Sequence, residues 1–231
     1  SEMCIRDRNE EGQVACVACE LGSYCAEGAA AALPCNEGSY SSSTSLTSAA
    51  ECTRTDQGHY ASTGSTQQTP CAAGTAQASS GMGSCSKCAA GTFQDEEGKL
   101  TCKPCTAGSY CAEGAAAALP CPGGTHKDAS LAVMTSVSQC VDCGPGTSCS
   151  VGSAAATPCA PGTITAITGQ SECFPCNGGE YVATSGATAC AECSAGSYCE
   201  AGSPSERQCP AGTASGTPGL GDATRPAQRE R

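Results

Sequence analysis

The sequence predicts a small disulfide-rich fold: an elongated tandem array of cysteine-rich modules with short two-stranded ribbons and turns, little helix and no large hydrophobic core. Cysteine supplies 23 of the 231 residues, the cysteines recur at fixed spacings, and large apolar side chains are scarce. Val, Ile, Leu, Met and Phe together supply only 22 residues. Their burial, at about 25 cal/mol per Å² of apolar surface, cannot offset the entropy that the chain loses on folding. We therefore expect disulfides to supply the stability.

Composition and charge restrict the compartment and the partners. A cysteine content this high is typical of disulfide scaffolds, which persist in secreted, luminal or cell-surface proteins. The formal net charge of -11 disfavours nucleic acid or an anionic membrane surface as a partner. We predict an extracellular or cell-surface location. The sequence shows no leader and no apolar run of about 18 residues, so we expect the export signal, and any membrane anchor, to lie elsewhere in a longer parent protein.

The two ends of the chain depart from the pattern of the rest. Residues 1–8, SEMCIRDR, resemble a translated sequencing-library adapter and are left out of the fold prediction. Without Cys4, the remaining 22 cysteines are even in number. The tail TRPAQRER stands where the repeat predicts a cysteine. We expect a truncation or frameshift near Asp222.

The cysteine spacing divides the chain into modules of two types. Each of six C-x2-C pairs is interpreted as the end of one module and the start of the next. The long type reads C-x5-C-x9-C-x(13–18)-C, and the short type reads C-x13-C. The predicted modules are 9–52 (long), 53–70 (short, without its cysteine pair), 71–87 and 88–104 (short), 105–142 and 143–175 (long), 176–192 (short) and 193–231 (long, incomplete).

One short module has lost both of its cysteines, at Thr55 and Gln68. A paired loss leaves no reactive thiol, which indicates that the two cysteines of a short module bond each other. The predicted short-module disulfides are Cys71–Cys85, Cys88–Cys102 and Cys176–Cys190. Each closes a loop of about 15 residues, worth roughly 3 kcal/mol in the chain-entropy model. Residues 53–70 should therefore be the softest part of the chain.

A glycine stands three residues after the opening or third cysteine of every module, and the module without its cysteine pair keeps Gly58. Its fixed place suggests a turn with positive φ, or a close approach of the backbone to a disulfide. Ser or Thr usually follows, and then often an aromatic residue, which we expect to cover a neighbouring disulfide. These register glycines are Gly22, Gly38, Gly58, Gly74, Gly91, Gly108, Gly124, Gly146, Gly162, Gly179, Gly196 and Gly212.

The stretch GSYCAEGAAAALPC occurs twice, at 22–35 and 108–121. The matching segments SVGSAAATP (150–158) and EAGSPSERQ (200–208) keep the length and the glycine but little else. We interpret the stretch as a spacer between two cysteines, and its duplication as a recent copying of modules. A repeated alanine-rich contact surface is the alternative.

Units such as CAAGTFQDEEGKLTCKPCTAGSYC (88–111) and CPAGTASGTPGL (209–220) resemble the ephrin-receptor-like cysteine-rich repeats of large extracellular proteins. The resemblance covers about residues 16–221. The alternation of one-disulfide and two-disulfide modules is also similar to tumour necrosis factor receptor ectodomains. That resemblance implies that the first cysteine of a long module pairs with the third and the second with the fourth. The implied pairs are Cys19–Cys35, Cys25–Cys52, Cys105–Cys121, Cys111–Cys140, Cys143–Cys159 and Cys149–Cys173.

Metal and catalytic chemistry find little support in the sequence. C-x2-C pairs can hold zinc, but a zinc ribbon leaves its linker free of cysteine, and here lone cysteines fall between the pairs. The two histidines, His59 and His126, look like loop residues, and no catalytic triad can be assembled. The run DEEGK at 95–99 is typical of a solvated turn and lacks the ligand spacing of an EF-hand. We predict no cofactor, no metal and no enzymatic activity.

The sequence therefore favours a non-catalytic extracellular structural or adhesive repeat region of a larger surface or secreted protein, with an unknown extracellular protein or glycan as partner. The first alternative is a ligand-binding receptor ectodomain. Its candidate surface is the insert THKDASLAVMTSVSQ at 125–139, which holds Leu131, Val133, Met134 and Val137. The second alternative is an intracellular zinc-binding cysteine-rich protein.

Overall fold

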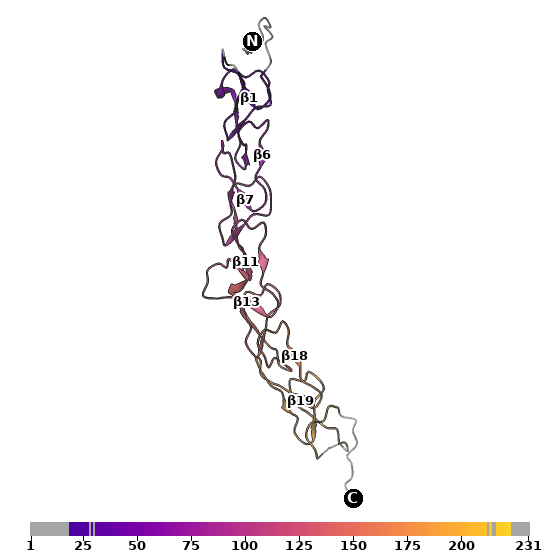
Figure 1. Cartoon of the computed structure of the whole chain (residues 1–231). Helices are drawn as coiled ribbons and strands as arrows, with labels where there is room; N and C mark the ends of the chain where they lie inside the picture. The colour runs from indigo at the N-terminus through magenta and orange to yellow at the C-terminus, as the bar shows by residue number, and fades with distance from the viewer. Residues whose placement is uncertain (1–18, 28, 30, 212, 214–215, 223–231) are drawn as a thin grey trace. The chain divides into compact units, whose positions relative to one another are not determined.

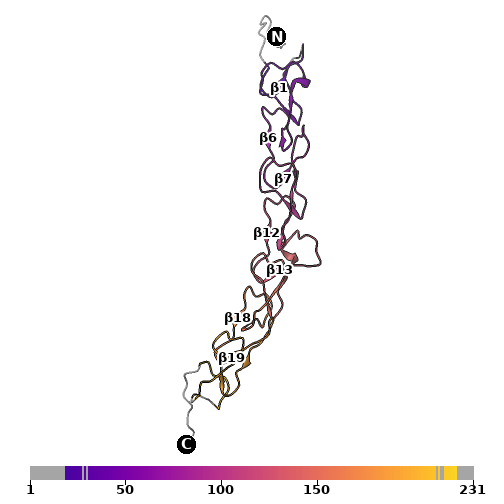
Figure 2. The ribbon, with the colours of Figure 1, turned by 180° about the vertical axis from the view of Figure 1, so that it is seen from behind.

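The computed structural model describes residues 19–27, 29, 31–211, 213 and 216–222, and it confirms a small disulfide-rich tandem array (Figure 1). These residues form eleven two-stranded antiparallel sheets, here called ribbons, and two short 3-10 helices. The chain divides into two compact units, Ser1–Cys105 with Cys111–Ala118 and Thr106–Tyr110 with Leu119–Arg231. Successive ribbons follow one another in order within each unit, as the reverse view also shows (Figure 2).

The first unit contains five ribbons. They are β1 (Ser23–Tyr24) with β2 (Leu33–Pro34), β3 (Ser39–Tyr40) with β4 (Thr53–Arg54), β5 (His59–Tyr60) with β6 (Thr69–Pro70), β7 (Thr75–Ala76) with β8 (Ser86–Lys87), and β9 (Thr92–Phe93) with β10 (Lys103–Pro104). The 3-10 helix η1 (Ala49–Glu51) lies before β4.

The second unit contains six ribbons. They are β11 (Ser109–Tyr110) with β12 (Leu119–Pro120), β13 (Thr125–Lys127) with β14 (Cys140–Asp142), β15 (Thr147–Ser148) with β16 (Thr157–Pro158), β17 (Thr163–Ile164) with β18 (Phe174–Pro175), β19 (Glu180–Tyr181) with β20 (Ala191–Glu192), and β21 (Ser197–Tyr198) with β22 (Arg207–Gln208). The 3-10 helix η2 (Val137–Gln139) lies before β14.

All eleven ribbons are built in the same way. At Cys71, for example, a turn closes when Thr75 N donates to Ala72 O at 3.0 Å, and the chain then enters β7. After the loop and β8, Cys88 N donates to Gly74 O at 2.9 Å and starts the next turn. We call this repeating piece a rung and name it by its first residue. The rungs begin at Cys19, Cys35, Thr55, Cys71, Cys88, Cys105, Cys121, Cys143, Cys159, Cys176 and Cys193. A long module thus contains two rungs and a short module one.

Backbone hydrogen bonds join each rung to the next within a unit. Gly74 N donates to Gln94 O at 2.7 Å, and Gln77 N donates to Lys99 O at 3.1 Å. In the opposite direction, Gly98 N donates to Cys71 O at 2.8 Å. The second unit repeats these three bonds. They are donated by Gly146 N to Thr165 O at 2.8 Å, by Cys149 N to Gln170 O at 3.0 Å, and by Gly169 N to Cys143 O at 2.8 Å. Within each unit, the main chain therefore forms a ladder whose hydrogen bonds do not depend on the side chains of the loops.

Two positions of each rung fill the interior in place of a conventional core. One is the first residue of the rung, which is buried in ten of the eleven rungs, with half-buried Cys105 as the exception, and includes Thr55 at 1% exposure. The other is the residue six positions later, which is buried in ten rungs, with half-buried Lys127 as the exception. The buried residues at this second position are Cys25, Ser41, Ala61, Gln77, Gln94, Cys111, Cys149, Thr165, Val182 and Cys199.

The register glycines have the positive φ that the sequence predicts. All eleven that lie in the described residues fall between 75° and 93°, while Gly212 lies outside them. At nine of the eleven, the close neighbour is not a disulfide but a second glycine, two rungs further along the chain: a Cβ atom on Gly74, for example, would overlap the carbonyl oxygen of Gly114. The rungs of these nine glycines therefore contact their second neighbours as well as their first.

Candidate functional site

Ten disulfides line the described part of the chain, and each closes within a single rung. Six join the first residue of a rung to the residue three places before the next rung, namely Cys35–Cys52, Cys71–Cys85, Cys88–Cys102, Cys121–Cys140, Cys159–Cys173 and Cys176–Cys190. We call these loop disulfides. Four join the first residue to the residue six places later, namely Cys19–Cys25, Cys105–Cys111, Cys143–Cys149 and Cys193–Cys199. We call these turn disulfides.

The structure corrects the long-module pairing implied by the receptor resemblance. It contains neither Cys105–Cys121 nor Cys111–Cys140, and instead joins Cys105 to Cys111 and Cys121 to Cys140. The same correction applies to Cys19–Cys35, Cys25–Cys52, Cys143–Cys159 and Cys149–Cys173. The physical reason is that a long module is not one folding unit. Its third cysteine begins a new rung, as Cys121 N does by donating to Gly108 O at 2.9 Å, and each rung closes its own disulfide.

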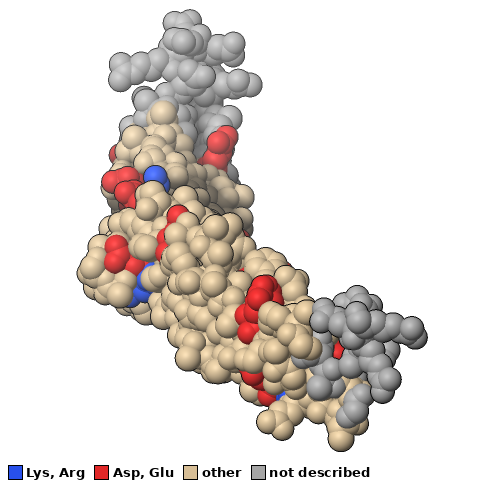
Figure 3. Space-filling view, turned by 90° about the horizontal axis from the view of Figure 1, so that it is seen from below, with Lys and Arg blue, Asp and Glu red and all other residues tan. Residues whose placement is uncertain are grey.

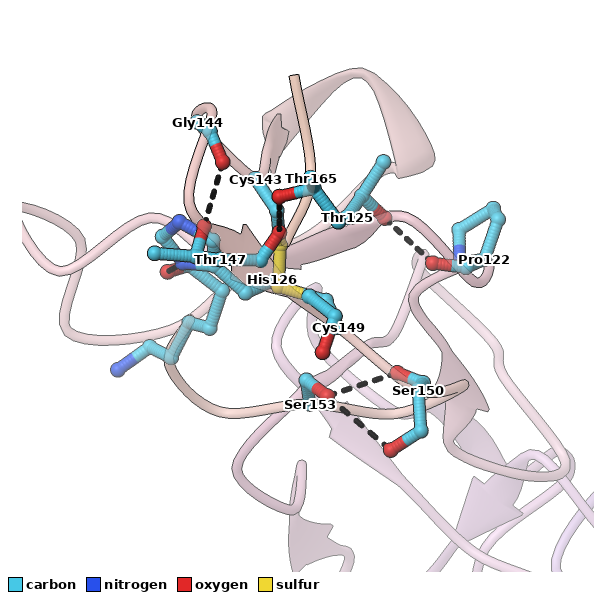
Figure 4. Close-up of a disulfide and its surroundings, with 12 residues drawn as sticks. Pro122, Thr125, His126, Cys143, Gly144, Thr147, Cys149, Ser150, Ser153 and Thr165 are labelled. Atoms are coloured by element: carbon cyan, nitrogen blue, oxygen red, sulfur yellow. Dashed lines mark hydrogen bonds between the residues drawn. A yellow bond between two sulfur atoms is a disulfide. The ribbon is translucent and has the colours of Figure 1, made fainter. Parts of the chain in front are cut away.

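The turn disulfide Cys143–Cys149 shows how the surrounding hydroxyl groups support such a bond (Figure 4). Thr147, inside the closed turn, donates its hydroxyl to Gly144 O at 2.7 Å. Thr165 of the next rung is buried and donates to Thr147 O at 3.2 Å. These bonds satisfy polar groups that would otherwise lie buried and unpaired beside the sulfur atoms.

In two of the rungs that have no turn disulfide, a buried glutamine occupies the second interior position. The Gln94 amide donates to Thr101 O at 2.7 Å and accepts from Glu96 N at 3.1 Å. Gln77 makes the equivalent bonds to Ser84 O and Ser79 N, both at 3.1 Å. In each case one side chain holds both sides of its loop. Sequence reasoning missed these residues because glutamine is usually exposed, although their spacing from the rung start would have identified them.

The Thr55 rung is the one described rung without a disulfide. The buried Thr55 hydroxyl accepts from Gly81 N at 3.0 Å and Met82 N at 3.1 Å. Gln68, at the second lost cysteine position, accepts from Asp56 N at 2.7 Å and donates to the Asp56 carboxylate at 2.8 Å. Hydrogen bonds therefore replace the covalent closure, and the β5–β6 ribbon keeps the register of the others.

In the acidic turn DEEGK (95–99), lysine side chains bind the carboxylates of Asp95 and Glu96, so these two groups do not surround an open position for a ligand. Lys103 lies 2.6 Å from the Asp95 carboxylate and 3.1 Å from that of Glu96, while Lys99 lies 2.6 Å from Glu96. The hydrogen bond from Lys103 lowers the pKa of Asp95. The hydrogen bonds from Lys99 and then Lys103 lower the pKa of Glu96, and Asp95 and Glu96 in turn raise the pKa of Lys103. This is a solvated ion-pair cluster at the tip of a loop.

The insert 125–139 belongs to the Cys121 rung, and its apolar residues divide into two groups. Met134 is 1% exposed and pairs through a parallel bridge with Tyr110, so it belongs to the interior. Val133 and Val137 are 47% and 49% exposed and lie on the surface of the loop. The loop is shaped by Asp128, whose carboxylate accepts from Ser130, and by a capping box at Ser136.

Further exposed apolar side chains lie on the same unit, where charge is sparse. Val151 and Ile167 are 66% and 65% exposed and occupy the same position of two consecutive rungs. Glu172 is the one charged residue between positions 143 and 175. On the face shown in Figure 3, acidic side chains are scattered over a largely uncharged surface.

No three His, Cys, Asp or Glu side chains come together as metal ligands in the described ranges. The two cysteines of a described C-x2-C pair belong to different disulfides, as Cys85 and Cys88 do. Cys209 carries a free thiol. His59 and His126 lie in strands β5 and β13 and not in loops, and the Nδ1 atom of each ring contacts a nearby main-chain oxygen. The predicted adapter-like segment 1–8, Cys4, Cys16 and the tail after Asp222 lie outside the described residues.

The rung architecture defines the class of this protein as a disulfide-rich tandem repeat with an extracellular location. Residues 74–118 match the family model described as tyrosine-protein kinase ephrin type A/B receptor-like. The match and the ladder together show that the chain contains an ephrin-receptor-like cysteine-rich repeat, which is a receptor-like and not a catalytic family. No curated protein matches the chain in sequence. Within the described residues, the structure has no helix with the length and apolar character needed to span a bilayer.

Proposed function

We propose that this chain is a non-catalytic structural or adhesive repeat region of a larger secreted or surface protein. The observation that carries the proposal is the uniform backbone ladder, in which bonds such as those of Gly74 and Gly98 link neighbouring rungs while the loops vary in sequence. A spacer or contact surface needs such a repeat, because each rung adds length and surface without changing its neighbours. The disulfides within the rungs support a role outside the cell.

Disulfide closure within each rung should make the array resistant to proteases. Most cleavage requires a segment to open locally, and short closed loops restrict that opening. We expect the oxidised full chain to resist trypsin and proteinase K under conditions that degrade the reduced and alkylated chain to peptides. Equal digestion of the two forms would contradict the proposal.

Solution scattering provides a second test. A compact domain of this length has a radius of gyration of about 17 Å, and a spacer should clearly exceed that value when oxidised. A radius near that of a compact domain would favour a globular receptor module.

The second candidate function is a ligand-binding ectodomain, and the exposed pair Val133 and Val137 on the longest rung favours it. The matched family is described as receptor-like, which supports a protein ligand. The test is binding of the labelled, oxidised chain to cells that express the parent protein. A matched control changes Val151 and Ile167 to serine, because both are apolar and even more exposed, on other rungs of the same unit.

Loss of saturable binding in V133S/V137S, but not in V151S/I167S, would support the ectodomain. Equal binding by both variants would support the structural role. Met134 is unsuitable for this test because it is buried, so that Met134→Ser should destabilise its rung by about 2 kcal/mol or more.

A further inference from the structure

We infer that the disulfide-free Thr55 rung is a load-sensitive extension element, which opens as one step while the rungs around it stay covalently closed. This inference rests on the proposed structural function, since a spacer between two attachment points bears tension. The feature that motivates it is the path that tension would take through the covalent connections of the chain.

A loop disulfide removes almost the whole rung from that path. In the Cys71 rung, tension passes through the Cys71–Cys85 bond to Cys88, so the enclosed loop carries no load. A turn disulfide removes only the turn. In the Cys105 rung, for example, the load passes through Cys105–Cys111 and then through the ten residue steps from Cys111 to Cys121.

No disulfide shortens the path through the Thr55 rung. Cys52 bonds backwards to Cys35, and Cys71 bonds forwards to Cys85. The chain between Cys52 and Cys71 therefore carries the load through all 19 residue steps. At full extension this segment measures about 65 Å, compared with about 35 Å for ten steps. It is the longest stretch without a covalent bypass between Cys19 and Cys199.

No covalent bond closes this segment, which is held by hydrogen bonds and by the burial of Thr55 and Ala61. Within the rung, Gln68 and Asp56 bond each other near the surface at 2.7 and 2.8 Å, where water competes for both groups. Towards the preceding rung, Gly64 N donates to Cys35 O at 2.8 Å. Towards the following rung, Gly58 N donates to Gln77 O at 2.8 Å. Opening the rung breaks these bonds and leaves the Cys35 and Cys71 rungs closed by their own disulfides.

The experiment is single-molecule force spectroscopy on the oxidised full chain. Handles are attached through azide-bearing residues at the exposed positions Leu21 and Ala201, so that the load excludes both terminal segments. The variant Thr55→Cys/Gln68→Cys restores a loop disulfide at the two lost cysteine positions, with its formation checked by intact mass. The variant Asp56→Ala/Gln68→Ala removes the side-chain bonds but adds no covalent closure.

We expect one extension step in the wild-type chain that is about twice as long as any other, and we expect it at the lowest force. It should vanish in T55C/Q68C and occur at lower force with unchanged length in D56A/Q68A. Hydrogen exchange of the wild-type chain provides a check that needs no variant: the amides of Ala61, Gly64 and Ser65 should exchange faster than those of Gln77, Gln94 and Gly98, whose acceptors lie outside the Thr55 rung.

Persistence of the long step in the cross-linked variant, or its absence from a wild-type chain whose other rungs resist force, would overturn the inference alone. Smooth extension from the lowest forces, with no resisting rung anywhere, would overturn the proposed structural function as well.

Discussion

Gly146 and Gly186 stand two rungs apart, yet a methyl group on the first would overlap the carbonyl oxygen of the second. Gly146 also has a φ of 79°. Two independent constraints, a left-handed backbone and the close approach of another chain segment, therefore act on one residue. The same pair of constraints recurs at Gly22, Gly38, Gly58, Gly74, Gly108, Gly124, Gly162 and Gly179.

The two constraints on Gly146 can be separated with three alanine variants. Gly169 has a φ of 74° but no neighbour near its Cβ position, so Gly169→Ala should cost about 1–2 kcal/mol from the backbone alone. Gly146→Ala should cost more, because the Gly186 carbonyl must also move. Gly144 has neither constraint and serves as the control. Hydrogen exchange of the amides in the Cys143 and Cys159 rungs measures the stability that each variant loses. Equal losses in G146A and G169A would argue against the close approach.

The disulfide connectivity can be decided by one cleavage. Glutamyl endopeptidase cuts after Glu113, which lies between Cys111 and Cys121. With Cys105–Cys111 and Cys121–Cys140 bonded, that cut should separate the chain into two parts without reduction. If Cys105 bonded Cys121 and Cys111 bonded Cys140, the fragments on either side would remain linked. Non-reducing mass spectrometry after denaturation distinguishes the two results.

Gln94→Ala should open the loop of the Cys88 rung. The substitution removes a buried amide and leaves Thr101 O and Glu96 N without their partner, at a cost of about 1–3 kcal/mol. Faster exchange of the Glu96 amide would report the opening. Gln67→Ala is the matched control because Gln67 is exposed and makes none of these bonds. An unchanged Glu96 amide in Q94A would show that the side chain does not hold the loop.

The ion pairs at the tip of the same loop predict a pH dependence. Hydrogen bonds from the lysines lower the pKa of Asp95 and of Glu96 in the folded chain. Their contribution to stability is therefore fully present above the unfolded pKa values and is lost as the pH falls through the lower, folded ones. Because the groups are solvent-exposed, salt should weaken the effect. Titration by NMR should show the pKa values of Asp95 and Glu96 rising in Lys103→Gln and remaining unchanged in Lys87→Gln.

Much of this fold follows from the sequence because glycine and cysteine constrain the backbone directly. The positive φ of the register glycines could be predicted since few other residues adopt it. The long-module pairing implied by the receptor resemblance is wrong because the four cysteines of a long module belong to two rungs. The separation of 14 between Cys159 and Cys173, identical to that between Cys71 and Cys85, was the signal that they form the same kind of rung.

Other features could not be predicted because they arise only when rungs stack. The approach of Gly74 to Gly114 joins residues forty positions apart and leaves no mark in either local sequence beyond the glycines themselves. The buried position six residues after each rung start is also not evident from the sequence, because residues as different as Cys149, Gln94 and Thr165 occupy it. What they share is a place in the rung and not a residue type.

Since every described disulfide begins and ends inside one rung, a gene segment that encodes whole rungs can be copied or deleted without separating any cysteine from its partner. The identical stretches 22–35 and 108–121 each run from a register glycine to the first residue of the following rung, so that each includes all but the first three residues of a rung. Duplication or deletion of whole rungs therefore leaves every remaining disulfide closed, and the length of the protein can evolve in units of one rung.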